Sequence, residues 1–248
     1  MDRPTLAYFR DPPLDGATNM ARDEHLLHSP LRRPASLRIY QWTPPTLSLG
    51  YFQQYGDIAT LPEPLRGLSV VRRATGGGAI LHDREITYAL ILDDSISVAR
   101  RGPAELYRAV HECWRGVLAG DGIATELAPE NFPLPTPRTG PFFCFEKPGR
   151  TDLLIRGRKV LGSAQRRIPG RVMQHGSLIL GRGAVAQPGA DLGDPPSTVV
   201  DRWIDAFAAA LADSFGLTLV PATWRADELA DVAARSAVHA SDEWLRRR

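Results

Sequence analysis

The sequence predicts an α+β protein in which helices flank one mixed, mainly antiparallel sheet. Three observations favour this class. Segments rich in β-branched and aromatic residues, typical of strands, are frequent up to residue 92 and again between residues 151 and 180. Two long segments, 103–120 and 198–216, carry apolar residues at helical spacing. Strands and helices do not alternate in the β-α-β rhythm of a parallel sheet, so helices packed on a mixed sheet are expected.

The N-terminal part of the chain is expected to be mostly strand. In chain order we expect a strand at 5–9, a helix at 15–28, a pair of strands at 36–42 and 46–52, and strands at 68–73, 79–82 and 86–92. Pro44 and Pro45 separate the two members of the strand pair, because proline has no amide hydrogen to donate to a sheet.

Segment 103–120 is expected to be a helix, since Pro103 suits its first turn and Gly120 its end. The apolar residues that share one face of this helix are Leu106, Val110, Cys113 and Val117. Cys113 is therefore expected to pack in the core.

The C-terminal half begins with residues 128–150, a stretch rich in proline and polar residues that predicts a long, functional loop. A hairpin is expected at 151–167 with its turn at Gly157, then a strand at 171–180 and a linker at 188–197. The stripe of the following helix, 198–216, is Val200, Ile204, Phe207, Leu211 and Phe215. We expect one domain over 1–248, with a short helical extension from about residue 217.

Composition excludes several classes of protein. The net charge of +2 over 248 residues gives no basic field that would favour nucleic acid as a partner. No apolar run approaches the roughly 20 residues of a membrane span, and the N-terminus lacks the apolar stretch of a signal peptide, so a cytoplasmic protein is expected. Two cysteines, Cys113 and Cys144, provide neither a disulfide framework nor the paired spacing of a structural metal site.

The stretch RRATGGGAILHD, residues 72–83, holds three consecutive glycines between two apolar runs. No Gly-Lys-Ser/Thr follows them, so the stretch is not a phosphate loop, and the spacing of a dinucleotide fingerprint is also absent. Two interpretations remain open from the residues alone. The glycines form a wide turn between strands, or they let a ligand lie against bare backbone.

The motif RRATGGGAILHDREITYAL strongly resembles the signature of the lipoate–protein ligase A and octanoyltransferase superfamily. Further segments from residue 12 to residue 180 resemble the same family in the same order, including DLLIRGRKVLGSAQRRIPGRVMQHGSLIL. The resemblance implies a fold shared with biotin ligases and a tunnel for an acyl chain. The substrate-binding residues that it implies are Arg72, Gly76, Gly77, Gly78, His82, Gly162, Ser163, Ala164 and His175.

Two chemistries occur on this scaffold, and Cys144 distinguishes them. Ligases use ATP to activate the acyl group, whereas octanoyltransferases carry it on a cysteine. Cys144 lies fifteen residues before Lys159, as in the branch of cysteine-dependent octanoyltransferases with a Cys-Phe pair ahead of the lysine hairpin. The resemblance implies that both residues are catalytic. Because Lys159 follows a hairpin turn, its side chain is expected to reach solvent or a cavity, and its loss is expected to cost little stability.

The sequence departs from that branch at Gly78, where arginine is frequent and where three glycines are more typical of the ligases. In contrast, the segment HDREITYAL is closer to the transferases. We therefore expect octanoyl transfer from acyl carrier protein, through a cysteine thioester, to a lysine of lipoyl-domain proteins. The glycine cleavage H protein and the E2 subunit of 2-oxoacid dehydrogenases are the expected acceptors.

Three alternatives stay open from the sequence. One is an ATP-dependent lipoate–protein ligase, which alone would need ATP and Mg²⁺; no cofactor or metal is otherwise expected. Another is a transferase that moves octanoate from one lipoyl domain to another. The third is a non-catalytic protein that binds lipoate or octanoate.

Overall fold

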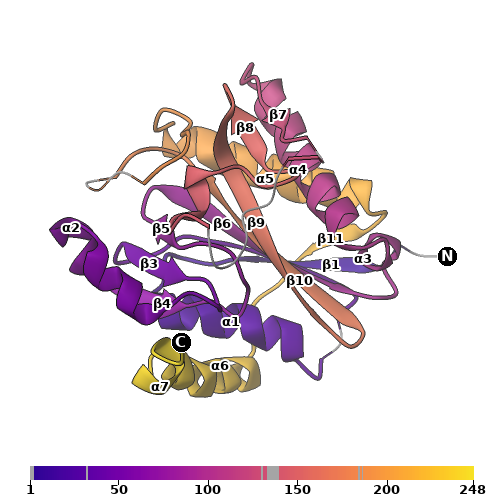
Figure 1. Ribbon diagram of the computed structural model, residues 1–248. Helices are drawn as coiled ribbons and strands as arrows, with labels where there is room; N and C mark the ends of the chain where they lie inside the picture. Colours follow the sequence, from indigo (N-terminus) through magenta and orange to yellow (C-terminus); the bar gives the residue numbers. More distant parts are fainter. Residues whose placement is uncertain (1–2, 32, 130, 133–139, 184, 186) are drawn as a thin grey trace.

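A computed structural model describes residues 3–31, 33–129, 131–132, 140–183, 185 and 187–248 of the chain. It confirms the α+β class, with helices on both faces of a large mixed sheet (Figure 1). A second, smaller sheet lies beside the large one, whereas the sequence analysis expected a single sheet. The functional features of the molecule lie where the two sheets meet.

The large sheet has eight strands in the order β11-β1-β2-β6-β10-β9-β8-β7. Their bounds are β1 Thr5–Arg10, β2 Ala35–Tyr40, β6 Glu85–Asp93, β7 Glu126–Leu127, β8 Leu153–Ile155, β9 Arg158–Ile168, β10 Arg171–Ile179 and β11 Thr218–Pro221. Strand β1 pairs in parallel with β2 and with β11, and the remaining pairs of this sheet are antiparallel. The expected hairpin turn is present between β8 and β9, where Arg156 and Gly157 have positive φ angles of 50° and 71°.

The small sheet has three strands in the order β4-β3-β5, namely β3 Thr46–Leu49, β4 Ser69–Arg72 and β5 Ile80–His82. The expected pairing of 36–42 with 46–52 is wrong, because β2 pairs with β1 and β6 while β3 pairs with β4 and β5. Residues 73–79, which include the three glycines, form the connection between β4 and β5 of this small sheet.

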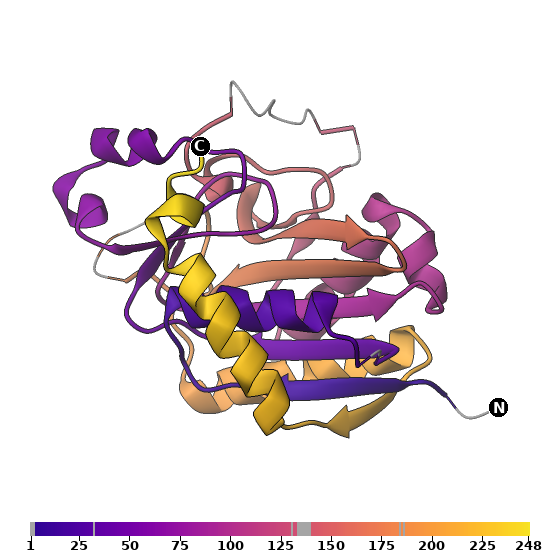
Figure 2. The same ribbon diagram turned by 90° about the horizontal axis from the view of Figure 1, so that it is seen from below.

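Helices cover both faces of the large sheet (Figures 1 and 2). The long ones are α1 Gly16–His28, α4 Pro103–Gly120, α5 Ser197–Ser214 and α6 Ala226–His239. The shorter turns are η1 Tyr55–Thr60, α2 Glu63–Arg66, α3 Ser97–Arg100, η2 Cys144–Glu146 and α7 Asp242–Leu245. Helices α4 and α5 pack together on one face, and α1 and α6 on the other. None of the described helices is long and apolar enough to cross a membrane.

The larger core joins α4 and α5 to the sheet, where Trp114 stacks on Phe207 with ring centroids 4.1 Å apart. The buried face of α4 is Leu106, Val110, His111, Trp114 and Leu118, whereas Cys113 and Val117 are only partly buried beside it. The buried face of α4 is thus rotated slightly about the helix axis relative to the face expected from the sequence, and it includes His111. The predicted stripe of α5 is correct, with Phe215 half-buried at its end.

The segment after Phe215 completes the structure in two ways. Strand β11 joins the edge of the large sheet in parallel with β1. Helix α6 then packs across α1 (Figure 2), and Trp244 of α7 donates a hydrogen bond from Nε1 to the carbonyl oxygen of Arg72. The C-terminal segment therefore supports β4, the strand that leads into the glycine stretch.

Candidate active site

A pocket lies between the small sheet and strands β9 and β10 of the large sheet. The space among its lining residues is about 430 Å³, including the part that opens to solvent. The lining residues are Met20, Tyr40, Trp42, Arg73, Gly76, Gly77, Ile80, His82, Thr87, Cys144, Gly162, Ser163, Ala164, His175, Gly176 and Ser177. Most of the expected site residues are in this set, although they come from four separate parts of the sequence.

Cys144 is held against the glycine stretch by backbone pairing. Its amide nitrogen donates to the carbonyl oxygen of Ala79 at 2.9 Å, and the Ala79 amide donates to Phe142 at 2.8 Å. A Cβ atom on Gly78 would lie 2.8 Å from the Cys144 nitrogen and 3.0 Å from the Phe142 oxygen. A side chain at residue 78 would therefore push the cysteine segment away, which explains why glycine is required there.

The other two glycines form the wall of the pocket. Gly77 has a φ angle of +97°, which is unfavourable for residues with a side chain. Its carbonyl oxygen packs so tightly on Gly50 that a Cβ there would lie 1.9 Å away. Gly76 and Gly77 both line the pocket. Of the two interpretations left open by the sequence, a bare backbone wall therefore fits the geometry better than a simple turn.

Lys159 lies beside the sulfur of Cys144. Its amino nitrogen donates to Sγ at 3.2 Å and lies 2.8 Å from the Asp152 carboxylate. The nitrogen is also 5.1 Å from the centroid of the Phe145 ring. The Lys159 residue is only 4% exposed, so the expectation that its side chain reaches solvent is wrong. Loss of this side chain would leave the buried Asp152 carboxylate unpaired.

The environment keeps Lys159 charged. Burial alone would lower the pKa of its ammonium, but the charges of Asp152 and Cys144 and their hydrogen bonds raise that pKa above its ordinary value. A permanent ammonium beside the cysteine sulfur stabilises a thiolate, which is the reactive form in acyl transfer. The same ammonium is a donor for the oxygen of a carbonyl group that reacts at Sγ.

Gly162, Ser163 and Ala164 follow Lys159 on β9 and line the pocket, as the resemblance implied. A Cβ on Gly162 would lie 2.0 Å from Cε and 2.3 Å from Nζ of Lys159. Glycine at residue 162 thus leaves the space that the lysine side chain occupies. The Ser163 hydroxyl lies 2.6 Å from both the Tyr88 hydroxyl and Nε2 of His111.

Arg72, an expected binding residue, is not among the residues that line the pocket. Its guanidinium is fully buried and donates to the carbonyl oxygens of Gly50, Tyr51, Gln53 and Leu245. Arg73 lines the pocket instead, and it donates to the carbonyl oxygens of Gly76 and Gly78 at 3.3 and 2.9 Å. Burial lowers the pKa of Arg73 to about 10, although Cys144 opposes that shift.

His82 lines the pocket with its ring, which stacks on Trp42 at a centroid distance of 3.9 Å. Both ring nitrogens are already bonded, Nε2 to the Ser48 hydroxyl at 2.7 Å and Nδ1 to Glu85 at 3.0 Å. Burial lowers the pKa of His82, with Glu85 opposing the shift. Both ring nitrogens are therefore engaged within the protein, and the lowered pKa favours the neutral ring.

His175 also lines the pocket, and its ring nitrogens are likewise bonded. Nε2 lies 2.6 Å from the Thr75 hydroxyl, and Nδ1 lies 3.3 Å from the Asp23 carboxylate. Asp23 in turn accepts hydrogen bonds from Arg38 and Tyr40 at 2.7 Å each. Burial would raise the pKa of Asp23, but the His175 hydrogen bond and the Arg38 charge lower it below its usual value. His175 thus anchors the segment that carries the glycines.

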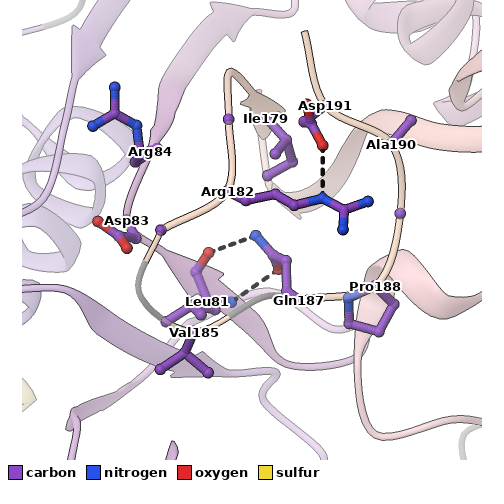
Figure 3. A pocket seen from close by; sticks show the side chains of 13 residues that line it. Leu81, Asp83, Arg84, Ile179, Arg182, Val185, Gln187, Pro188, Ala190 and Asp191 are labelled. Atoms are coloured by element: carbon purple, nitrogen blue, oxygen red, sulfur yellow. Dashed lines mark hydrogen bonds and ion pairs between the residues drawn. The ribbon is translucent and has the colours of Figure 1, made fainter. Parts of the chain in front are cut away.

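A separate hollow lies next to Leu81 of β5 (Figure 3). Gln187 donates to the Leu81 carbonyl at 2.7 Å and accepts from its amide at 3.2 Å, while the Ala190 amide donates to the carbonyl oxygen of Lys159 at 2.7 Å. The described residues that line the hollow include no cysteine, lysine or histidine. Residues 187–190 therefore support β5 and Lys159 through these hydrogen bonds.

Within the described parts of the chain, no group of three or more metal-ligating residues could hold an ion.

Comparison with known proteins identifies the family of this fold and site. Residues 15–182 match the family described as the lipoyl protein ligase A/B catalytic domain. The chain belongs to this family. The matched range contains Cys144, Lys159 and the whole glycine stretch.

Curated relatives within the family carry the name octanoyltransferase LipM. The protein of that name from Geobacillus kaustophilus is 41% identical over 175 residues, which are 66% of this chain and 61% of that protein. Its namesake from Brevibacillus brevis is 34% identical over 266 aligned positions, covering 94% of this chain and 95% of that protein. The first alignment thus spans less than two thirds of the relative, and the second nearly all of it.

Solved structures show the same fold at lower sequence identity. A putative lipoate protein ligase from T. acidophilum superposes with a TM-score of 0.76 at 19% identity, covering 100% of both chains. Lipoate-protein ligase A bound with ATP gives a TM-score of 0.74 at 17% identity, covering 99% of both chains. The lipoyl protein ligase fold expected from the sequence is therefore confirmed.

Proposed function

We propose that this protein is an octanoyltransferase that moves an octanoyl group from acyl carrier protein to a lysine of lipoyl-domain proteins. The observation that carries the proposal is the 3.2 Å contact of Lys159 Nζ with the Sγ atom of Cys144, a residue that lines the pocket. The names of the curated relatives support the same activity.

The first half-reaction needs a thiolate and a polarised carbonyl group. The Cys144 thiolate attacks the carbonyl carbon of the octanoyl donor, and the sulfur of the carrier leaves as a thiolate. Lys159, held charged by Asp152, stabilises the thiolate before the attack and the carbonyl oxygen during it. Donor and product are both thioesters of similar energy, so no ATP is required for this exchange.

The pocket suits the acyl chain because its wall combines bare backbone with apolar side chains. Gly76 and Gly77 let the chain approach the backbone closely. The apolar surface comes from Met20, Tyr40, Trp42 and Ile80. Burying apolar surface stabilises the bound chain by roughly 0.8 kcal/mol for each methylene group.

The second half-reaction transfers the octanoyl group from Cys144 to the amino group of the acceptor lysine. The Cys144 thiolate is the leaving group, and the Lys159 ammonium again stabilises it. Lipoyl-domain proteins such as the glycine cleavage H protein or an E2 subunit are the proposed acceptors. Because the reaction needs a reduced cysteine, we place it in the cytoplasm, and it requires no cofactor.

The proposal is tested by mixing the protein with octanoyl-acyl carrier protein and a lipoyl domain, with and without ATP. Octanoylation of the lipoyl domain, followed by intact mass, is expected at the same rate in both samples. Free octanoate is expected to give no product. Strict dependence on ATP with free octanoate or lipoate would instead assign the protein to the ligases. An octanoylated lipoyl domain as the preferred donor would indicate transfer between lipoyl domains.

A further inference from the structure

Arginine and aromatic side chains meet on the surface beside the pocket, and the half-reactions above do not use them. The guanidinium of Arg247 lies 4.7 Å from the ring centroid of Tyr51 and 4.6 Å from that of Trp244. The guanidinium of Arg248 lies 5.8 Å from the ring centroids of both Tyr51 and Phe52. We call these five residues the basic rim.

The basic rim borders the opening of the pocket. Most of the residues that line the pocket are buried, but Gly77 is exposed, and Gly76 and Cys144 are among the partly exposed ones. The pocket therefore opens to solvent beside these residues. The Phe52 ring packs on Gly76, since a Cβ atom there would lie 3.7 Å from it. Phe52 is itself 61% exposed, so an apolar ring and two arginines stand together next to the opening.

Hydrogen bonds to the backbone hold the basic rim in place. The amide of Tyr55 donates to the carbonyl oxygen of Arg248 at 3.0 Å, and Trp244 donates from Nε1 to the carbonyl oxygen of Arg72 at 3.0 Å. The Arg72 guanidinium in turn donates to the carbonyl oxygen of Leu245 at 2.8 and 3.0 Å. Side chains that are already ordered lose less entropy when a partner binds, so this surface is prepared for docking.

The charges of Arg247 and Arg248 are not neutralised within the described parts of the chain. No described carboxylate pairs with either guanidinium, whereas Arg246 pairs with Asp242 at 3.3 Å. Arg72 adds a third positive charge beneath them. Burial lowers the pKa of Arg72, and the charges of Arg247 and Arg248 lower it further. An arginine stacked on aromatic rings still presents its N–H edge, which binds carboxylate and phosphate groups.

The two substrates of the proposed function bring different charges to this opening. The acceptor brings the amino group of a lysine, which the arginines repel when it is protonated. The donor brings a thioester on a phosphopantetheine arm, whose phosphate is negative, and a carrier surface that is expected to be acidic. The arm also lets the thioester enter the pocket while the carrier stays outside. The basic rim therefore suits the donor better than the acceptor.

We propose that the basic rim is the docking surface of the acyl donor, an acidic carrier protein that places the phosphate of its arm against Arg247 and Arg248. This inference rests on the proposed function and adds the place where its first substrate binds. The arm passes over Gly76 and Gly77 into the pocket, and the octanoyl thioester reaches Cys144. The lipoyl domain binds after the carrier has left and does not depend on these two charges.

The test measures single-turnover acylation of Cys144 by intact mass over a range of donor concentrations. Arg247→Glu combined with Arg248→Glu reverses both charges without changing a residue that lines the pocket. At low ionic strength this variant is expected to lower the second-order rate of acylation by octanoyl-acyl carrier protein at least about tenfold, the lower range for lost electrostatic steering. Arg247→Gln with Arg248→Gln is expected to give a smaller loss. Both losses are expected to shrink in about 1 M salt, which screens charges beyond about 3 Å.

Three controls distinguish docking from a general effect on the enzyme. Octanoyl-N-acetylcysteamine, a small thioester without carrier or phosphate, is expected to acylate both variants as fast as the wild type. Arg100→Glu with Arg101→Glu makes the same change of charge at two adjacent exposed arginines by α3, on the opposite side of the molecule from the C-terminal end (Figure 1); normal acylation is expected. The concentration of lipoyl domain that half-saturates transfer from the isolated acyl-enzyme is expected to stay the same in every variant.

These measurements separate the failure of this inference from that of the proposed function. If the wild-type protein forms no octanoyl thioester with the carrier-bound donor, the proposed function is wrong and the docking surface with it. If the wild type acylates, three results overturn the docking surface alone: unchanged acylation by both variants, an equal loss with the small thioester, or an equal loss in the variant of Arg100 and Arg101. A loss confined to the lipoyl domain would assign the basic rim to the acceptor instead. The glutamine variant decides the question even where the charge reversal lowers stability.

Discussion

The carboxylate of Asp152 lies 2.8 Å from the amino nitrogen of Lys159, and both side chains are almost entirely buried. Removing one partner of such a pair leaves a buried charge without compensation. Lys159→Ala is therefore expected to lower the free energy of unfolding by about 3–5 kcal/mol. It is also expected to slow acylation of Cys144 by about 10²–10³-fold, as for the loss of one oxyanion donor. Chemical denaturation and single-turnover mass measurements give the two values.

A double variant separates these two effects of Lys159. Lys159→Ala combined with Asp152→Asn removes both charges, so most of the lost stability is expected to return while acylation stays slow. Lys159→Arg is expected to restore activity only partly, because its planar guanidinium places the charge differently. Acylation and transfer by Lys159→Ala within about threefold of wild type, far less than the expected loss, would make the lysine purely structural.

Gly162 controls the position of the Lys159 side chain. A Cβ at residue 162 overlaps Cε and Nζ of Lys159 rather than any backbone atom, so the flexible lysine moves and the fold survives. Gly162→Ala is expected to reduce acylation at least tenfold, within the range for a displaced donor, with little change in melting temperature. Gly116→Ala in α4 is the matched control, since nothing lies within 4 Å of its Cβ. It is expected to keep full activity and to gain up to about 1 kcal/mol of stability. Normal acylation by Gly162→Ala would show that Lys159 need not occupy this site.

Gly77 combines a left-handed backbone with a place in the pocket wall. Gly77→Val is expected to lose about 1–3 kcal/mol of stability to backbone strain and to prevent octanoate from binding. The measurement is the rise in melting temperature on adding octanoate. Gly102→Val is the matched control, because Gly102 has the same φ angle of +97°, open space around its Cβ and no place in the pocket. Equal protection of both variants by octanoate would mean that the glycines form only a turn.

The two cysteines are expected to differ sharply in reactivity. Burial raises the pKa of Cys113 to about 11, so this thiol stays protonated and unreactive at pH near 8. Cys144 lines the pocket beside the Lys159 ammonium. Iodoacetamide is therefore expected to modify Cys144 first, with octanoyl-acyl carrier protein protecting it. Peptide mapping checks this order, and faster labelling of Cys113 would contradict it.

The contribution of sequence to this account is clearest at Cys144 and Lys159. Both were identified from the resemblance of long motifs to a known family, and the structure brings them into contact although they are fifteen positions apart in the chain. The burial of Lys159 could not be foreseen in this way. It depends on Asp152, which lies immediately before β8 and belongs to no motif that the sequence analysis recognised.

Arg73 and His111 show two further limits of sequence analysis. Neighbouring residues of a strand point to opposite faces, and the sequence does not say which of Arg72 and Arg73 faces the pocket. His111 lies next to the apolar stripe of α4, and the stripe as predicted, through Cys113 and Val117, passed over it. The presence of Trp114, three residues later on the buried face, was the signal that the face was rotated.

The pairing of β3 in a separate sheet was also beyond the sequence. Strands β2 and β3 follow one another closely in the chain, and both segments have the composition of strands. Their closeness in the sequence therefore suggested that they pair with each other. In the structure β3 instead pairs with β4 and β5, the two strands that the glycine stretch connects. This pairing depends on the tertiary structure rather than on closeness in the sequence. This separation creates the space between the two sheets in which the pocket lies.

The central claim, that Cys144 carries the acyl group as a thioester, is tested most directly by intact mass. The wild-type protein is mixed with octanoyl-acyl carrier protein, and the mass is measured before and after neutral hydroxylamine, which cleaves thioesters but not amides. We expect one octanoyl group that hydroxylamine removes, the same adduct on Cys113→Ser, and none on Cys144→Ser. An adduct that resists hydroxylamine, or one that persists on Cys144→Ser, would contradict the account.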